Sequence, residues 1–128
     1  MKTLYLMRHA KSSWSFDELN DQERPLNDRG RDDAPRMGQA LAARHIKLDR
    51  LVSSPAVRAM STAVLVAREL AFPSADIVIE PTIYQADVDT LLAIIRAHAR
   101  RGAVGAADRP QPHHYRRGQP AVALAPER

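Results

Sequence analysis

The sequence contains no cysteine and few aromatic residues. Without cysteine, the chain cannot form disulfides, use a thiolate nucleophile or bind a metal ion through sulfur. A long hydrophobic run is also missing, because Arg8 interrupts the apolar start after a few residues. Such a start is too short for a signal-peptide core or a membrane span. We therefore expect a cytoplasmic protein with no membrane partner.

The chain has 128 residues and a formal net charge of +4. This length predicts one domain with its own core. Residues 1–95 carry 12 Lys and Arg against 13 Asp and Glu, whereas residues 96–128 carry seven Arg against two acidic residues. The basic character belongs to the last part of the chain, so no nucleic acid is expected as a partner. A nucleic-acid-binding tail stays a minor alternative, which predicts salt-dependent binding that is lost when residues 101–128 are deleted.

Strand-like and helix-like patterns alternate along the first hundred residues. Asn27 is expected to cap the first helix, while Gly30 and Pro35 weaken its first turns. Alternating strands and helices indicate an α/β fold with a parallel-type central sheet, whose ligands bind beyond the carboxyl ends of the strands. We expect the first strand to be buried. Strands are predicted at residues 3–7, 49–53 and 77–80, and helices at residues 28–45, 54–70 and 87–99.

The last part of the chain differs from the rest. Residues 101–128 contain four prolines and three glycines and show no apolar period. We therefore expect a domain of residues 1–100, followed by a basic, Pro- and Arg-rich tail at 101–128 that is disordered.

Arg8 and His9 directly follow the first predicted strand, at the edge where ligands bind. A neutral imidazole can attack phosphorus when a hydrogen bond to its other nitrogen sets the tautomer. The guanidinium group of Arg8 can bind phosphate oxygens. Taken alone, the dipeptide fits a surface Arg-His pair better than a catalytic one.

A second element changes this balance. Ser53, Ser54 and Pro55 open a helix that places Arg58 in its first turns, at the same edge of the sheet. Helix amino ends attract anions, and a cation there is unfavourable unless an anion compensates it. Arg58 therefore suggests a bound phosphate, with a solvated surface arginine as the simpler alternative.

These motifs, in this order, resemble the histidine phosphatase superfamily, also called phosphoglycerate-mutase-like. The resemblance is closest to its small SixA-type phosphohistidine phosphatase branch and runs from Leu4 to about Arg96. The matching residues are Leu4-Tyr5-Leu6-Met7-Arg8-His9-Ala10-Lys11-Ser12-Ser13-Trp14, Arg24-Pro25-Leu26-Asn27-Asp28-Arg29-Gly30, Asp33-Ala34-Pro35-Arg36-Met37-Gly38, Ser53-Ser54-Pro55-Ala56-Val57-Arg58-Ala59 and Thr62-Ala63.

The resemblance implies a three-layer α/β sandwich and a hydrolase that works through a phosphohistidine on His9, with no metal and no cofactor. Arg8 and Arg58 would hold the phosphoryl oxygens as charge develops. Lys11, Ser12 and Arg24 would be secondary substrate contacts.

The sequence departs from the family at the proton donor. The family commonly has an acidic residue just after a tyrosine near the third helix, where this chain has Gln85 after Tyr84. An amide cannot donate an acidic proton. Glu80, Asp87 and Glu18 are substitutes that the sequence does not rank.

The sequence also departs from the family at a second histidine. The family has a later motif like Gly-His-Asn-Pro at the end of another strand, whose histidine binds the phosphoryl group. Here His113 and His114 lie among prolines and arginines with no apolar strand before them. This context is more typical of a solvated tail than of a ligand pair.

One hypothesis explains the missing motif as a frameshift. Codons allowed for residues 101–115, read one nucleotide forward, include a strand-like Ala-Ala-Leu-Leu-Val-Leu-Leu-Ile followed by Gly-His-Asn-Pro-Thr-Ile-Thr. The fold would then be truncated at its carboxyl end, and activity would be weak. If the neighbouring frame of the coding DNA lacks Gly-His-Asn-Pro, the hypothesis is wrong.

The leading functional prediction is a phosphatase that acts on phosphohistidine in a phosphorylated protein, with impaired activity. Two alternatives stay open. One is a phosphatase for small phosphorylated metabolites, and the other is an inactive phosphate-binding fragment.

Overall fold

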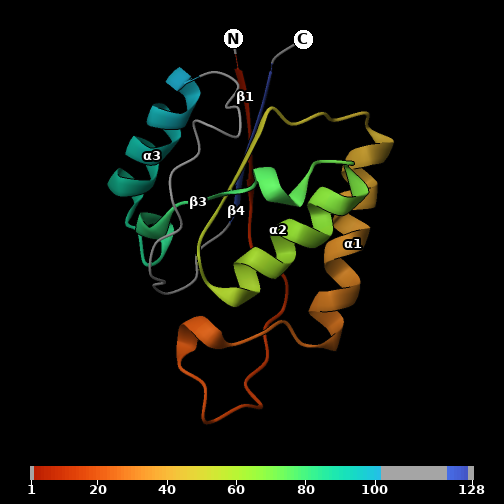
Figure 1. Ribbon diagram of the computed structural model, residues 1–128, viewed down its shortest axis with the longest axis vertical. Helices are drawn as coiled ribbons and strands as arrows, with labels where there is room; N and C mark the ends of the chain where they lie inside the picture. The colour runs from red at the N-terminus through yellow and green to blue at the C-terminus, as the bar shows by residue number, and fades with distance from the viewer. Residues whose placement is uncertain (1, 102–120, 127–128) are drawn as a thin grey trace.

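The computed structural model describes residues 2–101 and 121–126 (Figure 1). Across residues 2–101 and 121–126, every helix is too short or too polar to span a bilayer. The strands are β1 (Lys2–Met7), β2 (Arg50–Ser53), β3 (Val78–Ile79) and β4 (Ala121–Pro126), and the α-helices are α1 (Asp28–Ala43), α2 (Val57–Glu69) and α3 (Val88–Arg101). Short 3-10 turns η1 (Asp21–Glu23), η2 (Ser74–Asp76) and η3 (Pro81–Ile83) lie in the connections.

The strands and helices predicted between residues 3 and 99 all form, with ends shifted by a few residues. Helix α1 begins directly after Asn27, whose side chain accepts a hydrogen bond from the N–H of Gly30 at 2.8 Å. Neither Gly30 nor Pro35 delays the start of α1, although both lie inside it. Gly30 has a packing reason to be there, since a Cβ atom at this position would clash with the carbonyl oxygen of Lys11.

The sheet has the strand order β1-β4-β2-β3. β4 is antiparallel to both β1 and β2, and β3 is parallel to β2. β1, β2 and β3 therefore run in one direction, which confirms the predicted parallel-type arrangement, while β4 runs against it.

β4 lies in the segment for which the sequence predicted a disordered tail. Its backbone pairs along both of its sides, with residues of β1 and with residues of β2. A six-residue stretch of small and apolar residues is too short to be recognised from its period, whereas two neighbouring strand edges give it hydrogen-bond partners. The rest of the predicted tail, with His113 and His114, lies outside the described residues.

Helices cover both faces of the sheet (Figure 1). α1 and α2 lie on one face, where Ala63 and Ala67 of α2 pack with Leu51 of β2. α3 lies on the other face, where its apolar side chains pack on Val52 and Val78. This arrangement confirms the predicted three-layer α/β architecture.

β1 is less buried than the sequence predicts. Leu4 and Leu6 are 39% and 58% exposed, whereas Tyr5, on the opposite face, packs against the core below α2. The reason is the position of α3, which packs over β2 and β3. The apolar residues of β1 do not indicate that one face of this edge strand has no covering helix among the described elements.

The direction of the strands brings two motifs to one edge of the sheet. Arg8 and His9 follow the carboxyl end of β1, and Ser54 follows that of β2. The chain between β1 and α1 closes over this edge, because Ser13 donates its N–H to the carbonyl of Pro25 at 2.8 Å and Asn27 donates to that of Lys11 at 2.9 Å. The loop that projects from this base carries the candidate site.

Candidate active site

His9 is held in one tautomer by its own backbone neighbour. The ring is half-buried, and Nδ1 lies 2.8 Å from the carbonyl oxygen of Ala10. A carbonyl oxygen only accepts hydrogen bonds, so Nδ1 carries the proton and Nε2 keeps its lone pair. This is the form of imidazole that can attack an electrophile.

Thr62 connects the end of β1 to the first turns of α2. Its buried hydroxyl accepts the N–H of Ala10 at 3.0 Å and donates to the carbonyl of Arg58 at 2.8 Å. The residue after His9 is therefore tied to the backbone of Arg58. In the sequence Thr62 stands out only through the family resemblance, and no local pattern indicates this role.

The electrostatic environment keeps His9 uncharged. Burial of the ring is the largest cause that lowers the pKa of His9 below its ordinary value of 6.5, and the hydrogen bond to Ala10 acts in the opposite direction. The positive charges of Arg58, Arg8 and Arg24 lower this pKa further. The imidazole is therefore neutral at neutral pH, as a nucleophile must be.

This environment predicts a pH dependence. We expect kcat/KM to rise with pH along an acidic limb below 6.5, because His9 loses its proton there, and then to level off at neutral pH.

The same pKa shift makes stability depend on pH. At pH values between the folded and the unfolded pKa of His9, the unfolded chain binds the proton more readily than the folded one. The contribution of His9 to stability is therefore complete above about 6.5 and is lost as the pH falls through the folded pKa. A pH–rate profile and an NMR titration of the ring measure the acidic limb, and urea denaturation at several pH values measures the stability contribution. An acidic limb above 6.5 would contradict the prediction.

Arg58 lies at the amino end of α2 and is buried, with 5% of the residue exposed. Its Nη1 donates to the backbone carbonyl of Asp21 at 2.6 Å, and its Nη2 donates to Asp21 Oδ2 at 2.9 Å. Ala56, the residue that caps α2, offers no side-chain hydrogen bond to the helix. The alternative that Arg58 is a solvated surface arginine is therefore wrong, since Arg58 is buried and paired with an acidic residue.

Arg24 is fixed by a larger set of contacts. Its Nε donates to the carbonyl of Ser13 at 2.9 Å, its Nη1 donates to Asp21 Oδ1 at 2.9 Å and its Nη2 donates to Ser12 Oγ at 2.6 Å. The guanidinium also stacks on the ring of Trp14, with 3.2 Å from Cζ to the ring centre. Arg24 is 7% exposed, so its position is set by the protein and not by solvent.

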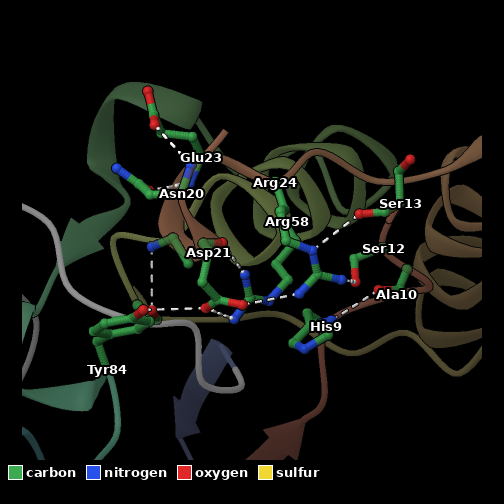
Figure 2. A network of polar contacts seen from close by, with 12 residues as sticks. His9, Ala10, Ser12, Ser13, Asn20, Asp21, Glu23, Arg24, Arg58 and Tyr84 are labelled. Atoms are coloured by element: carbon green, nitrogen blue, oxygen red, sulfur yellow. Dashed lines mark hydrogen bonds and ion pairs between the residues drawn. The ribbon is translucent and has the colours of Figure 1, made fainter. Parts of the chain in front are cut away.

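The structure brings only some of the predicted site residues together. His9, Ser12, Arg24 and Arg58 lie in one network, with both guanidinium groups next to the His9 ring (Figure 2). Arg8 and Lys11 have exposed side chains, and no side-chain hydrogen bond or ion pair joins either of them to the described part of this network. Arg8 still acts on the site through its charge, which lowers the pKa of His9.

Two of the three proposed proton donors have other partners. Asp87 caps α3 by accepting the N–H of Thr90 at 2.7 Å, and the hydrogen bonds from Thr90 lower the pKa of Asp87. Glu80 accepts the hydroxyl of Thr82 at 2.8 Å, and its other oxygen lies 3.6 Å from His98 Nε2. Glu18, the third candidate, is exposed in the projecting loop.

The acidic residue at the centre of the network is Asp21, which is not among the site residues predicted from the sequence. Asp21 lies in η1 and contacts Arg58, Arg24 and the hydroxyl of Tyr84. Asp21 lies in a polar loop whose sequence has no apolar periodicity, and charged residues in such loops are usually solvated. Its spacing of three residues from Arg24 is the one signal that could have indicated an ion pair.

The described residues offer no group of three or more His, Asp or Glu side chains that could hold a metal ion. The other described histidines lie elsewhere. His98 contacts Arg50, the first residue of β2, and His45 follows the carboxyl end of α1. Within residues 2–101 and 121–126, the network thus contains one histidine.

Comparisons with known proteins give one consistent result. A family model described as the histidine phosphatase superfamily (branch 1) matches residues 4–113. A structure from Agrobacterium tumefaciens, described as phosphohistidine phosphatase SixA, is 31% identical with a TM-score of 0.68 over 76% of this chain. The protein histidine phosphatase SixA in complex with tungstate is 27% identical with a TM-score of 0.69 over 81% of this chain. This chain spans 61% and 65% of the lengths of those two proteins. Among curated proteins, none matches the sequence.

Proposed function

The chain belongs to the histidine phosphatase superfamily, and we propose that it is a phosphatase that hydrolyses phosphohistidine on proteins, with His9 as the nucleophile. The observation that carries this proposal is the geometry around one imidazole. Its Nδ1 is committed to the carbonyl of Ala10, its pKa is lowered, and two buried guanidinium groups lie next to it. A nucleophile beside a cationic oxyanion site is the minimum that phosphoryl transfer requires.

The reaction that follows from this geometry has two steps. Nε2 of His9 attacks phosphorus, the bond from phosphorus to the substrate imidazole breaks, and the leaving imidazole takes up a proton from solvent. Water then attacks the phosphorus of phosphohistidine 9, the bond from phosphorus to Nε2 breaks, and inorganic phosphate leaves while one proton of the water returns to solvent. N–H groups of Arg58 and Arg24 stabilise the charge on the phosphoryl oxygens in both steps.

Two observations favour a protein as substrate. Both structural relatives are described as phosphohistidine or protein histidine phosphatases. The loop beside His9 also presents Trp14 and Phe16 to solvent, and exposed aromatic side chains around a reacting group are typical of protein contact surfaces. The substrate imidazole is a good leaving group, so the network needs no strong proton donor, in agreement with the other roles of Glu80 and Asp87.

The proposal includes slow turnover. The family resemblance implies a second histidine on the phosphoryl group, and His9 is the one histidine of the described network. Among residues 2–101 and 121–126, charge on the phosphoryl oxygens is then stabilised by arginines alone.

The test compares phosphate release from a phosphohistidine protein, from a small phosphoramidate and from an aryl phosphate. We expect release from all three, fastest for the protein, together with a phosphoenzyme that is stable to base and labile to acid in rapid-quench experiments. Equal rates on the protein and the phosphoramidate would favour small substrates. Rates that never exceed the uncatalysed ones would leave an inactive phosphate-binding fragment.

A further inference from the structure

We propose that Asp21 is a positioning residue of this site, whose carboxylate aligns the guanidinium groups of Arg24 and Arg58 so that their remaining N–H groups face His9. The inference rests on the proposed function and deepens it. Asp21 lies at the centre of a cationic site. A carboxylate does not itself attract a phosphate, so its presence there needs another explanation.

Asp21 uses all of its oxygen atoms on this task. Oδ1 accepts Arg24 Nη1 at 2.9 Å, and Oδ2 accepts Arg58 Nη2 at 2.9 Å. The hydroxyl of Tyr84 donates to Oδ2 at 3.1 Å, and the backbone carbonyl of Asp21 accepts Arg58 Nη1 at 2.6 Å. Arg58 therefore meets Asp21 through both ends of its fork, which fixes the plane of the guanidinium as well as its position.

The turn that carries Asp21 is itself held in place. The side chain of Asn20 accepts the N–H of Glu23 at 3.1 Å, and the Glu23 carboxylate accepts the N–H of Asn20 at 3.1 Å. This capping box closes η1 at its start. Asp21 is therefore presented from a rigid turn, and Tyr84 approaches it from the end of η3.

A count of donors shows what is left for a substrate. A guanidinium has five N–H groups. Asp21 takes two from Arg58, while Asp21, Ser12 and Ser13 together take three from Arg24. Both arginines keep N–H groups for a phosphoryl group. Figure 2 shows the Arg58 guanidinium between the Asp21 carboxylate and the His9 ring, and the Arg24 guanidinium next to the same ring, so Asp21 contacts both groups on sides that leave other N–H groups free.

The charge of Asp21 explains how two buried cations tolerate each other. Like charges in a partly desolvated site repel, and each unpaired ion loses hydration energy. Burial on its own would raise the pKa of Asp21, but the hydrogen bonds from Arg58 and Arg24 lower it below its ordinary value of 3.8. Asp21 is thus an anion throughout the neutral range, suited to alignment and unsuited to proton donation.

The experiment removes the negative charge of the Asp21 side chain and keeps its shape. For Asp21→Asn we expect kcat to fall about 10- to 100-fold, with KM changed less than threefold, because the arginines lose alignment needed in the transition state. The acidic limb of kcat/KM should also move to lower pH, since loss of the anion leaves uncompensated cations beside His9. Asp21→Glu should keep the limb at its wild-type position while lowering kcat.

The matched control is Asp28→Asn. Asp28 also forms an i,i+3 ion pair with an arginine, Arg31, but its side chain is 94% exposed. We expect wild-type kcat and an unmoved acidic limb for this variant. Wild-type kcat in Asp21→Asn, or a fall in kcat without a shift of the limb, would overturn the inference, because a purely structural loss reduces the active fraction without changing the pKa of His9.

The inference can fail separately from the proposed function. NMR titration reports the pKa of the His9 ring whether or not the protein turns over substrate. If the wild type proves inactive, a lower His9 pKa in Asp21→Asn still supports the alignment by Asp21, and an unchanged pKa overturns it. If Asp21→Asn does not fold, Asp21→Glu gives the decisive measurement, because its charge is retained and any shift of the limb contradicts the inference.

Discussion

Replacing His9 with alanine is expected to lower phosphate release by at least about 10³-fold, because removal of a nucleophile abolishes the covalent route. The residual rate would come from the arginines, which still bind the phosphoryl group and polarise it toward water. The measurement is kcat on the phosphohistidine protein and on the aryl phosphate, with rapid quench to show that no acid-labile phosphoenzyme forms.

The fold should survive this change. His9 is half-buried and donates one hydrogen bond, to the carbonyl of Ala10. The control is His45→Asn, at an exposed position after α1 with a φ of 58° that asparagine tolerates well. Wild-type rates are expected for this control. Equal rates for the wild type and His9→Ala would exclude both enzymatic interpretations and leave an inactive phosphate-binding fragment.

The second large effect is expected at Arg58. We expect Arg58→Lys to lose about 10²-fold in kcat/KM, although the positive charge is kept. Lysine is a point charge and cannot reach both the carbonyl and Oδ2 of Asp21 as the guanidinium fork does. The buried hydrogen bonds that are lost should also lower the free energy of unfolding by about 1–3 kcal/mol. Kinetics on the aryl phosphate and urea denaturation measure the two effects.

Arg68→Lys is the matched control, because Arg68 lies in the last turn of the same helix and is exposed. It should leave kcat/KM and the free energy of unfolding close to those of the wild type. If Arg58→Lys kept wild-type activity, the bidentate arrangement would be irrelevant to catalysis and a simple positive charge would suffice.

The sequence predicts those parts of the site that depend on neighbouring residues of the chain. An apolar run that stops at Arg8 and His9 fixes where a strand ends, and the shared direction of β1 and β2 then brings His9 and Arg58 to one edge. These positions follow from local patterns and one general rule of parallel sheets. The chemistry of an imidazole nucleophile also requires a hydrogen bond that sets the tautomer of His9. The sequence does not indicate that the carbonyl of Ala10 accepts this hydrogen bond.

What escaped prediction depends on contacts between distant segments. The sequence places Asp21 in a polar loop, and only the fold brings it to Arg58, 37 residues later, and to Tyr84, 63 residues later. The exposure of Leu6 depends on where α3 packs, and β4 forms between strands that lie far from it in the chain. Patterns of single segments do not carry such information.

The stacking of Arg24 on Trp14 has a practical consequence. Trp14 is the one tryptophan in the sequence, so the whole indole emission of the protein comes from the rim of the site. The ring is largely in water, with a guanidinium lying across one face. An oxyanion bound by Arg24 changes the charge next to the fluorophore, so occupancy of the site can be titrated optically, without a label and without turnover.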